Sequence, residues 1–193
     1  LGDVYKRQTL LMALTISSML PLGTELPKFS LPNTVDGSEF STTSLKEMPT
    51  LIMFICNHCP YVIHYHTLIQ QLETDFNNVF NLVAISSNDV STHPDDAPSK
   101  MTVLWKDLGL SIPYLYDESQ QIARQFQAEC TPEFYVFDSN NLLTYRGRAD
   151  DSSPNSGAPC GIDLTIAMRN TIDGQKVDIE QHPSMGCNIK WKS

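Results

Sequence analysis

The feature that most constrains this chain is an apolar run that leads directly into two closely spaced cysteines. Residues 50–55, TLIMFI, lie between Pro49 and Cys56. A short apolar run between such boundaries predicts a buried central strand. From 60 to 76 the apolar residues recur at steps of three and four, which predicts a helix with one buried face. The sequence CNHC, residues 56–59, is therefore expected where a strand turns into a helix.

The rest of the chain predicts alternating strands and helices. An N-terminal β-hairpin is expected from extended segments at 29–31 and 39–40 around the Asp36-Gly37 turn signal. Further strands are expected at 80–87, 112–117, 134–138 and 142–148, helices at 101–108, 119–127 and 162–171, and an exposed loop at 149–161. No element is expected before residue 24 or in the tail. This order predicts an α/β fold with one mixed sheet flanked by helices.

Composition excludes several classes of function. The chain has 193 residues, of which 41% are hydrophobic, so one ordinary domain with its own core is expected. Its formal charge of −9 repels phosphate backbones and anionic lipid surfaces, so we expect neither nucleic acid nor membrane as a partner. The sequence also lacks the roughly 18 consecutive apolar residues of a spanning helix.

The N-terminal segment allows two interpretations. Lys6 and Arg7 precede an apolar stretch that is similar to a signal segment at 6–23, which would export the protein to the periplasm. Polar residues interrupt that stretch, and no typical cleavage site follows it. We therefore expect residues 1–11 to be a non-native or disordered leader, the native protein to begin at Met12, and residues 12–193 to form a single cytoplasmic domain.

The five cysteines are too few for a disulfide-stapled scaffold, and their odd number suits a reducing compartment. Cys130 is expected near the CNHC pair, either as an alternative bridge or as a small buried residue. Cys160 is expected in the exposed loop. Cys187 is expected to be a packed residue of the tail.

The spacing of Cys56 and Cys59 favours redox chemistry. At the start of a helix, free N–H groups and the helix dipole stabilise a thiolate, so we expect a lowered pKa at Cys56. Cys59, one turn later, is then placed to attack a mixed disulfide formed at Cys56. His58 is expected to stabilise the thiolate further and to make the disulfide more oxidising. Asn57 and Pro60 are possible accessory residues.

Two other interpretations of the cysteine pair are weaker. A zinc site would use both cysteines with His64 and His66, but residues two apart on a helix point in different directions. Two buried cysteines without chemistry are also possible, although the Asn and His between them are poor core residues. We therefore expect no metal and no organic cofactor.

A second motif, CTPEFYVFD at 130–138, places a proline before an apolar strand, where an X-Pro bond can be cis. With FICNHCPYV, VAISSNDV, YRGRADDS and the terminal PSMGCNIKWK, the chain resembles bacterial redoxins of the thioredoxin superfamily, of the alkyl hydroperoxide reductase/thiol-specific antioxidant type. The resemblance implies a thioredoxin-like fold with an N-terminal hairpin. It also implies thiol-disulfide exchange at Cys56 and Cys59, with Thr131 and Pro132 docking the substrate. The implied partners are a disulfide-containing protein or a small thiol or peroxide, and a separate reductant or oxidant.

The chain departs from the thioredoxin pattern at one position. Thr50 stands where thioredoxins carry a buried acidic residue. Glu133 is a possible substitute, although a solvated surface carboxylate is the more usual state of a glutamate.

Two rival functions remain open. A thiol peroxidase of the peroxiredoxin type would match Pro49, but Met53 replaces the expected hydroxyl residue. Arg146 or Arg148 would have to stabilise its thiolate, whereas strand-edge arginines usually face solvent. A non-catalytic thioredoxin-like binding module is the third possibility, and the intact cysteine pair argues against it.

Overall fold

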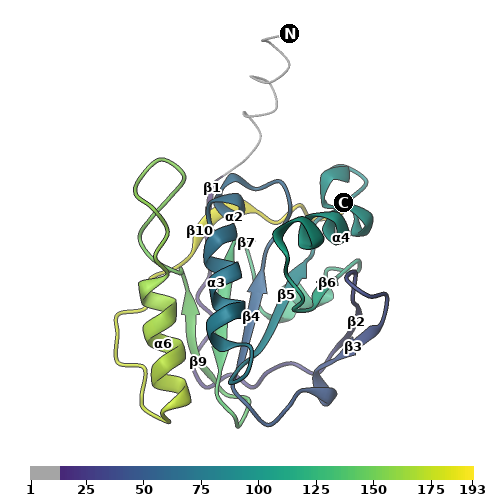
Figure 1. Ribbon diagram of the computed structural model, residues 1–193. Helices are drawn as coiled ribbons and strands as arrows, with labels where there is room; N and C mark the ends of the chain where they lie inside the picture. The colour runs from purple at the N-terminus through teal and green to yellow at the C-terminus, as the bar shows by residue number, and fades with distance from the viewer. Residues whose placement is uncertain (1–13) are drawn as a thin grey trace.

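The computed structural model describes residues 14–193, and its centre is a five-stranded mixed sheet (Figure 1). The strand order is β6-β5-β4-β8-β9. The strands are β4 (Thr50–Phe54), β5 (Asn81–Ser86), β6 (Tyr114–Tyr116), β8 (Glu133–Phe137) and β9 (Leu143–Gly147). The expected leader at 1–11 and the expected start at Met12 lie outside the described residues, as does part of the proposed signal segment.

Strand β4 is the middle of this sheet, and all five of its residues are buried. It pairs in parallel with β5 and antiparallel with β8. β8 and β9 form the expected antiparallel hairpin, with Asn141 at positive φ in its turn. The apolar run at 50–55 is thus the buried central strand that the sequence predicts, because it is covered on both faces.

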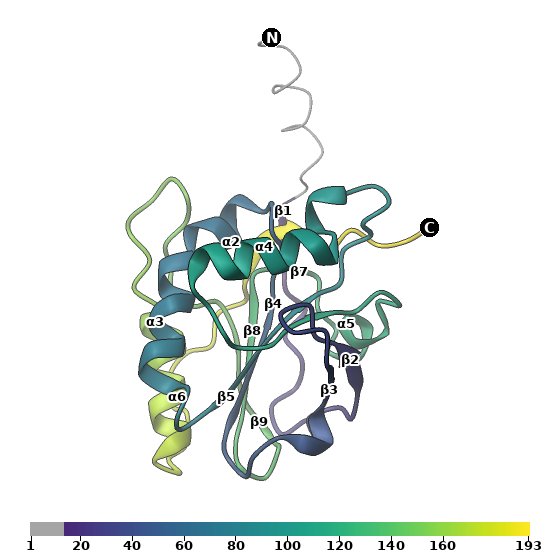
Figure 2. The same ribbon diagram turned by 45° about the vertical axis from the view of Figure 1, so that its right-hand side comes forward.

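Helices and a hairpin cover the two faces of the sheet (Figure 2). One apolar core contains residues of α2 (Pro60–His64), α3 (His66–Phe76), α4 (Pro98–Leu108) and α6 (Ile162–Ile172). The other contains residues of α5 (Gln121–Gln125) and of β2 (Ser30–Pro32), which pairs with β3 (Glu39–Ser41). Short 3-10 helices occur at η1 (Thr42–Ser44) and η2 (Pro94–Asp96). The expected mixed sheet with flanking helices and an N-terminal hairpin is confirmed.

The helix expected from 60 to 76 is divided in two. Tyr65, with φ −94° and ψ 6°, ends α2 and precedes α3. Buried residues continue through both parts, from Val62 to Phe76. The three-and-four spacing therefore predicted the buried face correctly, but it did not reveal the break.

A second sheet joins the two ends of the chain and was not predicted. The described part of it has three strands, β1 (Leu14–Ile16), β10 (Met185–Asn188) and β7 (Cys130–Thr131), in the order β1-β10-β7. β10 lies antiparallel between the other two, in the upper part of Figure 1, and β7 immediately precedes β8 in the sequence. The expectation of unstructured ends was wrong because these short strands are formed by pairing across the fold rather than by a local pattern.

None of the helices in residues 14–193 has the length and the apolar run that crossing a bilayer requires.

Candidate active site

Cys56 and Cys59 occupy the connection between β4 and α2. β4 ends at Phe54, and Cys59 is the N-cap residue of α2, directly before Pro60. Proline suits this first helical position because its missing N–H would have no helical partner there. Cys56 is 1% exposed and Cys59 is fully buried. The local sequence therefore places both sulfur atoms at one end of the central strand, inside the protein.

The segment around Pro132 lies against both cysteines. The Thr131–Pro132 peptide bond is cis. The hydroxyl of Thr131 is 3.4 Å from Cys56 Sγ, and the carbonyl oxygen of Thr131 is 3.2 Å from Cys59 Sγ. The structure thus brings the two motifs together across more than 70 residues of sequence.

A third cysteine joins this pair from the C-terminal strand. Cys187 Sγ lies 2.8 Å from Cys59 Sγ, and Cys187 is opposite Thr131 in the pairing of β10 with β7. The sequence predicted a packed tail residue, which is correct, but its contact with Cys59 was not predicted. The backbone at Thr131, which the resemblance assigns to substrate docking, already pairs with the chain's own tail.

The protonation of the pair differs from the sequence-based expectation. Hydrogen bonds from the thiols of Cys187 and Cys56 and from the backbone N–H groups of Val62 and Cys187 lower the pKa of Cys59. Burial opposes this lowering, and the carbonyl of Thr131 can accept only from a protonated Cys59.

The expected lowering at Cys56 was wrong. Burial raises the pKa of Cys56, and its hydrogen bond to Cys59 and the charge of Asp96 raise it further. α2 begins at Pro60, four residues after Cys56, so Cys56 lies outside the first turn, where the helix dipole acts most strongly. In the reduced pair the thiolate is therefore favoured at Cys59, and Cys56 carries the shared proton.

His58 is held by a buried carboxylate. Its Nδ1 is 2.7 Å from Asp96 Oδ2, at ion-pair distance although not in a well-aligned hydrogen bond. Burial opposes a charge on the ring, but Asp96 raises the pKa of His58 above its usual value, and the charge of Cys59 adds to this. A cationic His58 near neutral pH is what the predicted tuning role requires.

Asp96 itself was missed by the sequence analysis. It is fully buried, and it accepts hydrogen bonds from the backbone N–H of Asn57 and the side-chain amide of Asn88, both at 2.8 Å. These donors and His58 lower the pKa of Asp96 although burial opposes them. The sequence HPDD at 93–96 looks like a polar surface loop, and no local signal separates Asp96 from exposed Asp95.

Two aromatic rings complete this side of the site. Tyr114 on β6 donates its hydroxyl hydrogen to Asn57 Oδ1 at 3.1 Å. The ring of His93 stacks on that of His58, with centroids 5.3 Å apart. Asn57 was expected only as an accessory residue. It is hydrogen-bonded to Tyr114 through its side chain and to Asp96 through its backbone N–H.

Glu133 is buried rather than solvated. Its side chain is fully buried and accepts a hydrogen bond from the backbone N–H of Glu129. Its Oε1 accepts a second hydrogen bond from the hydroxyl of Tyr135 at 2.7 Å. Burial raises the pKa of Glu133 to about 7. The preference for a surface carboxylate was wrong because β8 is covered on both faces of the sheet.

The remaining cysteines occupy different surroundings. Cys130 is buried, and its Sγ lies 4.0 Å from Glu133 Oε2. Burial raises the pKa of its thiol, so Cys130 has the surroundings of a small core residue. Cys160 is exposed, as expected.

The arginines considered for a peroxidase make other contacts. Arg148 pairs with Asp163 at 2.8 Å, and Arg146 Nη1 donates to Gln181 at 2.6 Å. Both side chains are partly buried and partly exposed, so the expectation that they face solvent is met only in part. These partners lie on α6 and in the tail, not at the cysteines.

The histidines of the zinc interpretation lie elsewhere. His64 Nε2 is 2.8 Å from Ser152 Oγ, and His66 is half-buried. Among residues 14–193, the set able to hold a metal is Cys56, His58 and Asp96, whose donor atoms lie within 4.8 Å of one another. Both oxygens of Asp96 already accept hydrogen bonds, and the absence of a metal remains a prediction.

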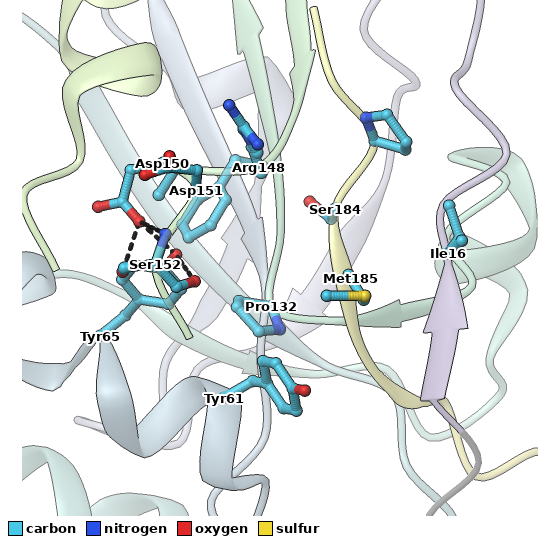
Figure 3. A pocket seen from close by; sticks show the side chains of 13 residues that line it. Ile16, Tyr61, Tyr65, Pro132, Arg148, Asp150, Asp151, Ser152, Ser184 and Met185 are labelled. Atoms are coloured by element: carbon cyan, nitrogen blue, oxygen red, sulfur yellow. Dashed lines mark hydrogen bonds between the residues drawn. The ribbon is translucent and has the colours of Figure 1, made fainter. Parts of the chain in front are cut away.

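A cavity of about 230 Å³ is lined in part by Pro132 (Figure 3). Tyr61 and Pro132 lie next to each other at one end, and Ser184 and Met185 of the tail lie beside them. At the other end Asp150 accepts a hydrogen bond from Tyr65 at 2.8 Å. The cavity offers an apolar side and a polar side next to the cis-proline.

These features define a thioredoxin-like protein: a mixed sheet between helices, with a cysteine pair at the end of the central strand facing a cis-proline. The chain belongs to the Redoxin family, whose model matches residues 21–158.

Solved structures share this fold. An uncharacterised conserved protein from Geobacillus kaustophilus is 42% identical, with a TM-score of 0.91, over 95% of this chain and 98% of that one. A hypothetical protein from Sinorhizobium meliloti 1021 is 35% identical, with a TM-score of 0.90, over 93% and 99%. A secreted disulfide oxidoreductase from Mycobacterium tuberculosis shares the fold at 16% identity and a TM-score of 0.59, over 73% and 94%. No curated protein matches the chain.

Proposed function

We propose that this redoxin is a thiol-disulfide oxidoreductase that works through reversible disulfide formation between Cys56 and Cys59. The observation that carries the proposal is the contact of both sulfur atoms with Thr131, next to the cis-proline. Membership of the Redoxin family and the shared fold with a disulfide oxidoreductase support it. A purely structural cysteine pair would have no need of a charged His58 nearby.

The protonation of the reduced pair favours the oxidising direction. A substrate thiolate attacks Cys56 Sγ, the Cys56–Cys59 bond breaks, and its electron pair leaves on Cys59 as a thiolate. A second substrate thiolate then attacks the substrate sulfur of the mixed disulfide and releases Cys56, which takes a proton. In this turnover the substrate loses two electrons and the cysteine pair gains them. A separate disulfide compound then oxidises the pair and re-forms the Cys56–Cys59 bond. Cys59 is the better leaving group because its pKa is lowered.

His58 and Asp96 act through the charge of Cys59. A cationic imidazole stabilises the thiolate, and Asp96 keeps the imidazole charged and fixed. Stabilising the reduced pair makes its disulfide a stronger oxidant. Both residues are therefore positioning and tuning residues rather than groups that exchange electrons.

A redox titration tests the proposal. The wild type is equilibrated in glutathione buffers, quenched with acid and alkylated, and we expect one disulfide between Cys56 and Cys59 that forms at a defined potential. Cys56→Ser and Cys59→Ser should each abolish this disulfide and the catalysed oxidation of a peptide dithiol. Cys160→Ser, which removes an exposed thiol, should change neither.

Two outcomes would contradict the proposal in different ways. A wild type whose cysteines alkylate no faster than a model thiol and that forms no Cys56–Cys59 disulfide would indicate a binding module. Hydroperoxide consumption at an undiminished rate by Cys59→Ser would instead support a peroxidase that uses Cys56 alone.

A further inference from the structure

The C-terminal strand passes directly over the cysteine pair. β10 pairs antiparallel with β7, so that Cys187 is opposite Thr131 and Asn188 is opposite Cys130. On its other side β10 pairs with β1. The strand is therefore held from both sides, and Cys187 is 4% exposed. Its thiol is part of the same buried site as Cys56 and Cys59.

The approach of β10 to the cis-proline segment is unusually close. A Cβ at Gly186 would lie 2.1 Å from the carbonyl oxygen of Thr131, a contact that only glycine avoids. Gly186 has no left-handed φ that would explain the residue in another way. The glycine lets the backbone come close enough for the adjacent Cys187 to reach Cys59.

The sulfur atom of Cys59 contacts those of both Cys56 and Cys187. Cys59 Sγ is 2.8 Å from Cys187 Sγ and is hydrogen-bonded to the thiol of Cys56. An attacking thiolate must reach one sulfur of a disulfide while the other sulfur leaves. Cys59 is thus the sulfur atom whose disulfide partner can change from Cys56 to Cys187.

We propose that Cys187 is a third redox-active thiol, which attacks Cys59 Sγ of the Cys56–Cys59 disulfide and forms a Cys59–Cys187 disulfide. The Cys56–Cys59 bond breaks, its electron pair leaves on Cys56, and Cys56 takes up the proton that Cys187 lost. No electrons enter or leave, so the step needs no further oxidant. The inference rests on the proposed function, because that function supplies the first disulfide.

The loss of the negative charge at Cys59 on oxidation favours the attack by Cys187. In the reduced protein the hydrogen bond to Cys59 raises the pKa of Cys187, with burial as a second cause. Once Cys59 is in a disulfide, its negative charge is gone and the first cause disappears. Cys187 therefore becomes a better nucleophile when there is a disulfide for it to attack. The exchange regenerates a free thiol at Cys56 and ties β10 to the residue that precedes α2.

Peptide mapping tests the exchange in the wild type. The protein is oxidised to one disulfide per chain with oxidised glutathione, quenched with acid at successive times, alkylated and digested with trypsin. Cys56 and Cys59 share the peptide 47–100, and Cys187 lies in the peptide 177–190. We expect the disulfide internal to 47–100 to form first and a crosslink between the two peptides to grow at its expense.

Three serine variants identify which sulfur atoms form the crosslink. Cys56→Ser should give the crosslink as its main disulfide, whereas Cys59→Ser and Cys187→Ser should lose it. Gly186→Ala keeps all five thiols but moves β10 away from Thr131, so the crosslinked fraction should fall several-fold while the internal disulfide remains. Met185→Ala, which shortens an exposed side chain on the same strand, is the matched control and should resemble the wild type.

The outcomes separate this inference from the proposed function. An internal disulfide without any crosslink in the wild type would overturn the role of Cys187 and leave the proposed function intact. A crosslink that persists in Cys59→Ser would overturn the attack on Cys59. Absence of the internal disulfide at every time would overturn the proposed function, and with it the exchange step.

Discussion

Two fully buried carboxylates, Asp96 and Glu133, lie near the cysteines and have opposite pKa shifts. Asp96 accepts from a backbone N–H and a side-chain amide and pairs with His58, so its pKa is lowered. Glu133 accepts from the Tyr135 hydroxyl and from the backbone N–H groups of Glu129 and Cys130, but it has no ion-pair partner among residues 14–193, and burial raises its pKa to about 7. Burial alone therefore does not decide the charge of a carboxylate; with similar numbers of donors, the nearby cation makes the difference.

The difference also separates two sides of the site. The Asp96 side is charged near neutral pH and holds His58, and through it the thiolate of Cys59. The Glu133 side, next to Cys130 and Tyr135, gains or loses a proton near neutral pH. The predictions below test this contrast from the largest expected effect to the smallest.

Removing the charge of Asp96 should have the largest effect. In Asp96→Asn the amide cannot accept from all the donors that now surround the carboxylate, and His58 loses its partner. We expect a loss of about 3 kcal/mol or more in the free energy of unfolding, as for other broken buried pairs. Urea unfolding at pH 7 measures it, and Asp95→Asn, at the exposed neighbouring residue, is the control. Equal effects of the two changes would contradict the structural role of Asp96.

The two carboxylates should give opposite dependences of stability on pH. Because the folded pKa of Asp96 is lowered from 3.8, its contribution is present above that pH and is lost as the pH falls through the folded value. Because the folded pKa of Glu133 is raised from 4.5 to about 7, its ionisation destabilises the fold as the pH rises between these values.

Glu133→Gln isolates the second effect. The glutamine amide can donate to Tyr135, whose hydroxyl can donate to the carbonyl of Phe126, while its oxygen accepts from Glu129. Relative to this variant, the wild type should lose on the order of 3 kcal/mol between pH 4.5 and 7. Urea unfolding across that range measures the difference, with exposed Glu118→Gln as the control. Parallel curves for wild type and Glu133→Gln would show that Glu133 does not titrate in this window.

His58→Ala tests whether the Asp96 side sets the redox potential. Loss of the cation should raise the pKa of Cys59, destabilise the reduced pair and make the potential more negative by about 30 mV for each pKa unit. Glutathione titration measures this shift. His182→Ala, which removes an imidazole near Glu180, is the control. An unchanged potential would remove the tuning role of His58.

Thr131→Val should have the smallest effect. Valine keeps the branched shape but removes the hydroxyl that lies 3.4 Å from Cys56 Sγ. We expect a loss of about 1 kcal/mol, typical of one hydrogen bond. Thermal unfolding compares it with Thr43→Val, whose side chain lies in an exposed turn. A loss several times larger would mean that the hydroxyl supports more of the site than its contact with Cys56.

The sequence determined the parts of this protein that depend on local order. The apolar run at 50–55 predicted a buried strand, Pro60 marked the start of the next helix, and Pro132 marked a bond that can be cis. These features follow from side-chain periodicity and from the fixed φ of proline, which act within a few residues. Family resemblance then paired the cysteines with Pro132.

Only the tertiary structure decided the chemistry around them. The contact of Cys59 with Cys187 spans 128 residues, and it depends on a β10 strand that has no sequence pattern of its own. The burial of Asp96 and Glu133 likewise depends on which elements cover them, and that burial, with their partners, sets both charges. The thiolate is favoured at Cys59 rather than at Cys56 for the same reason: pKa values follow the donors that the fold gathers around each group.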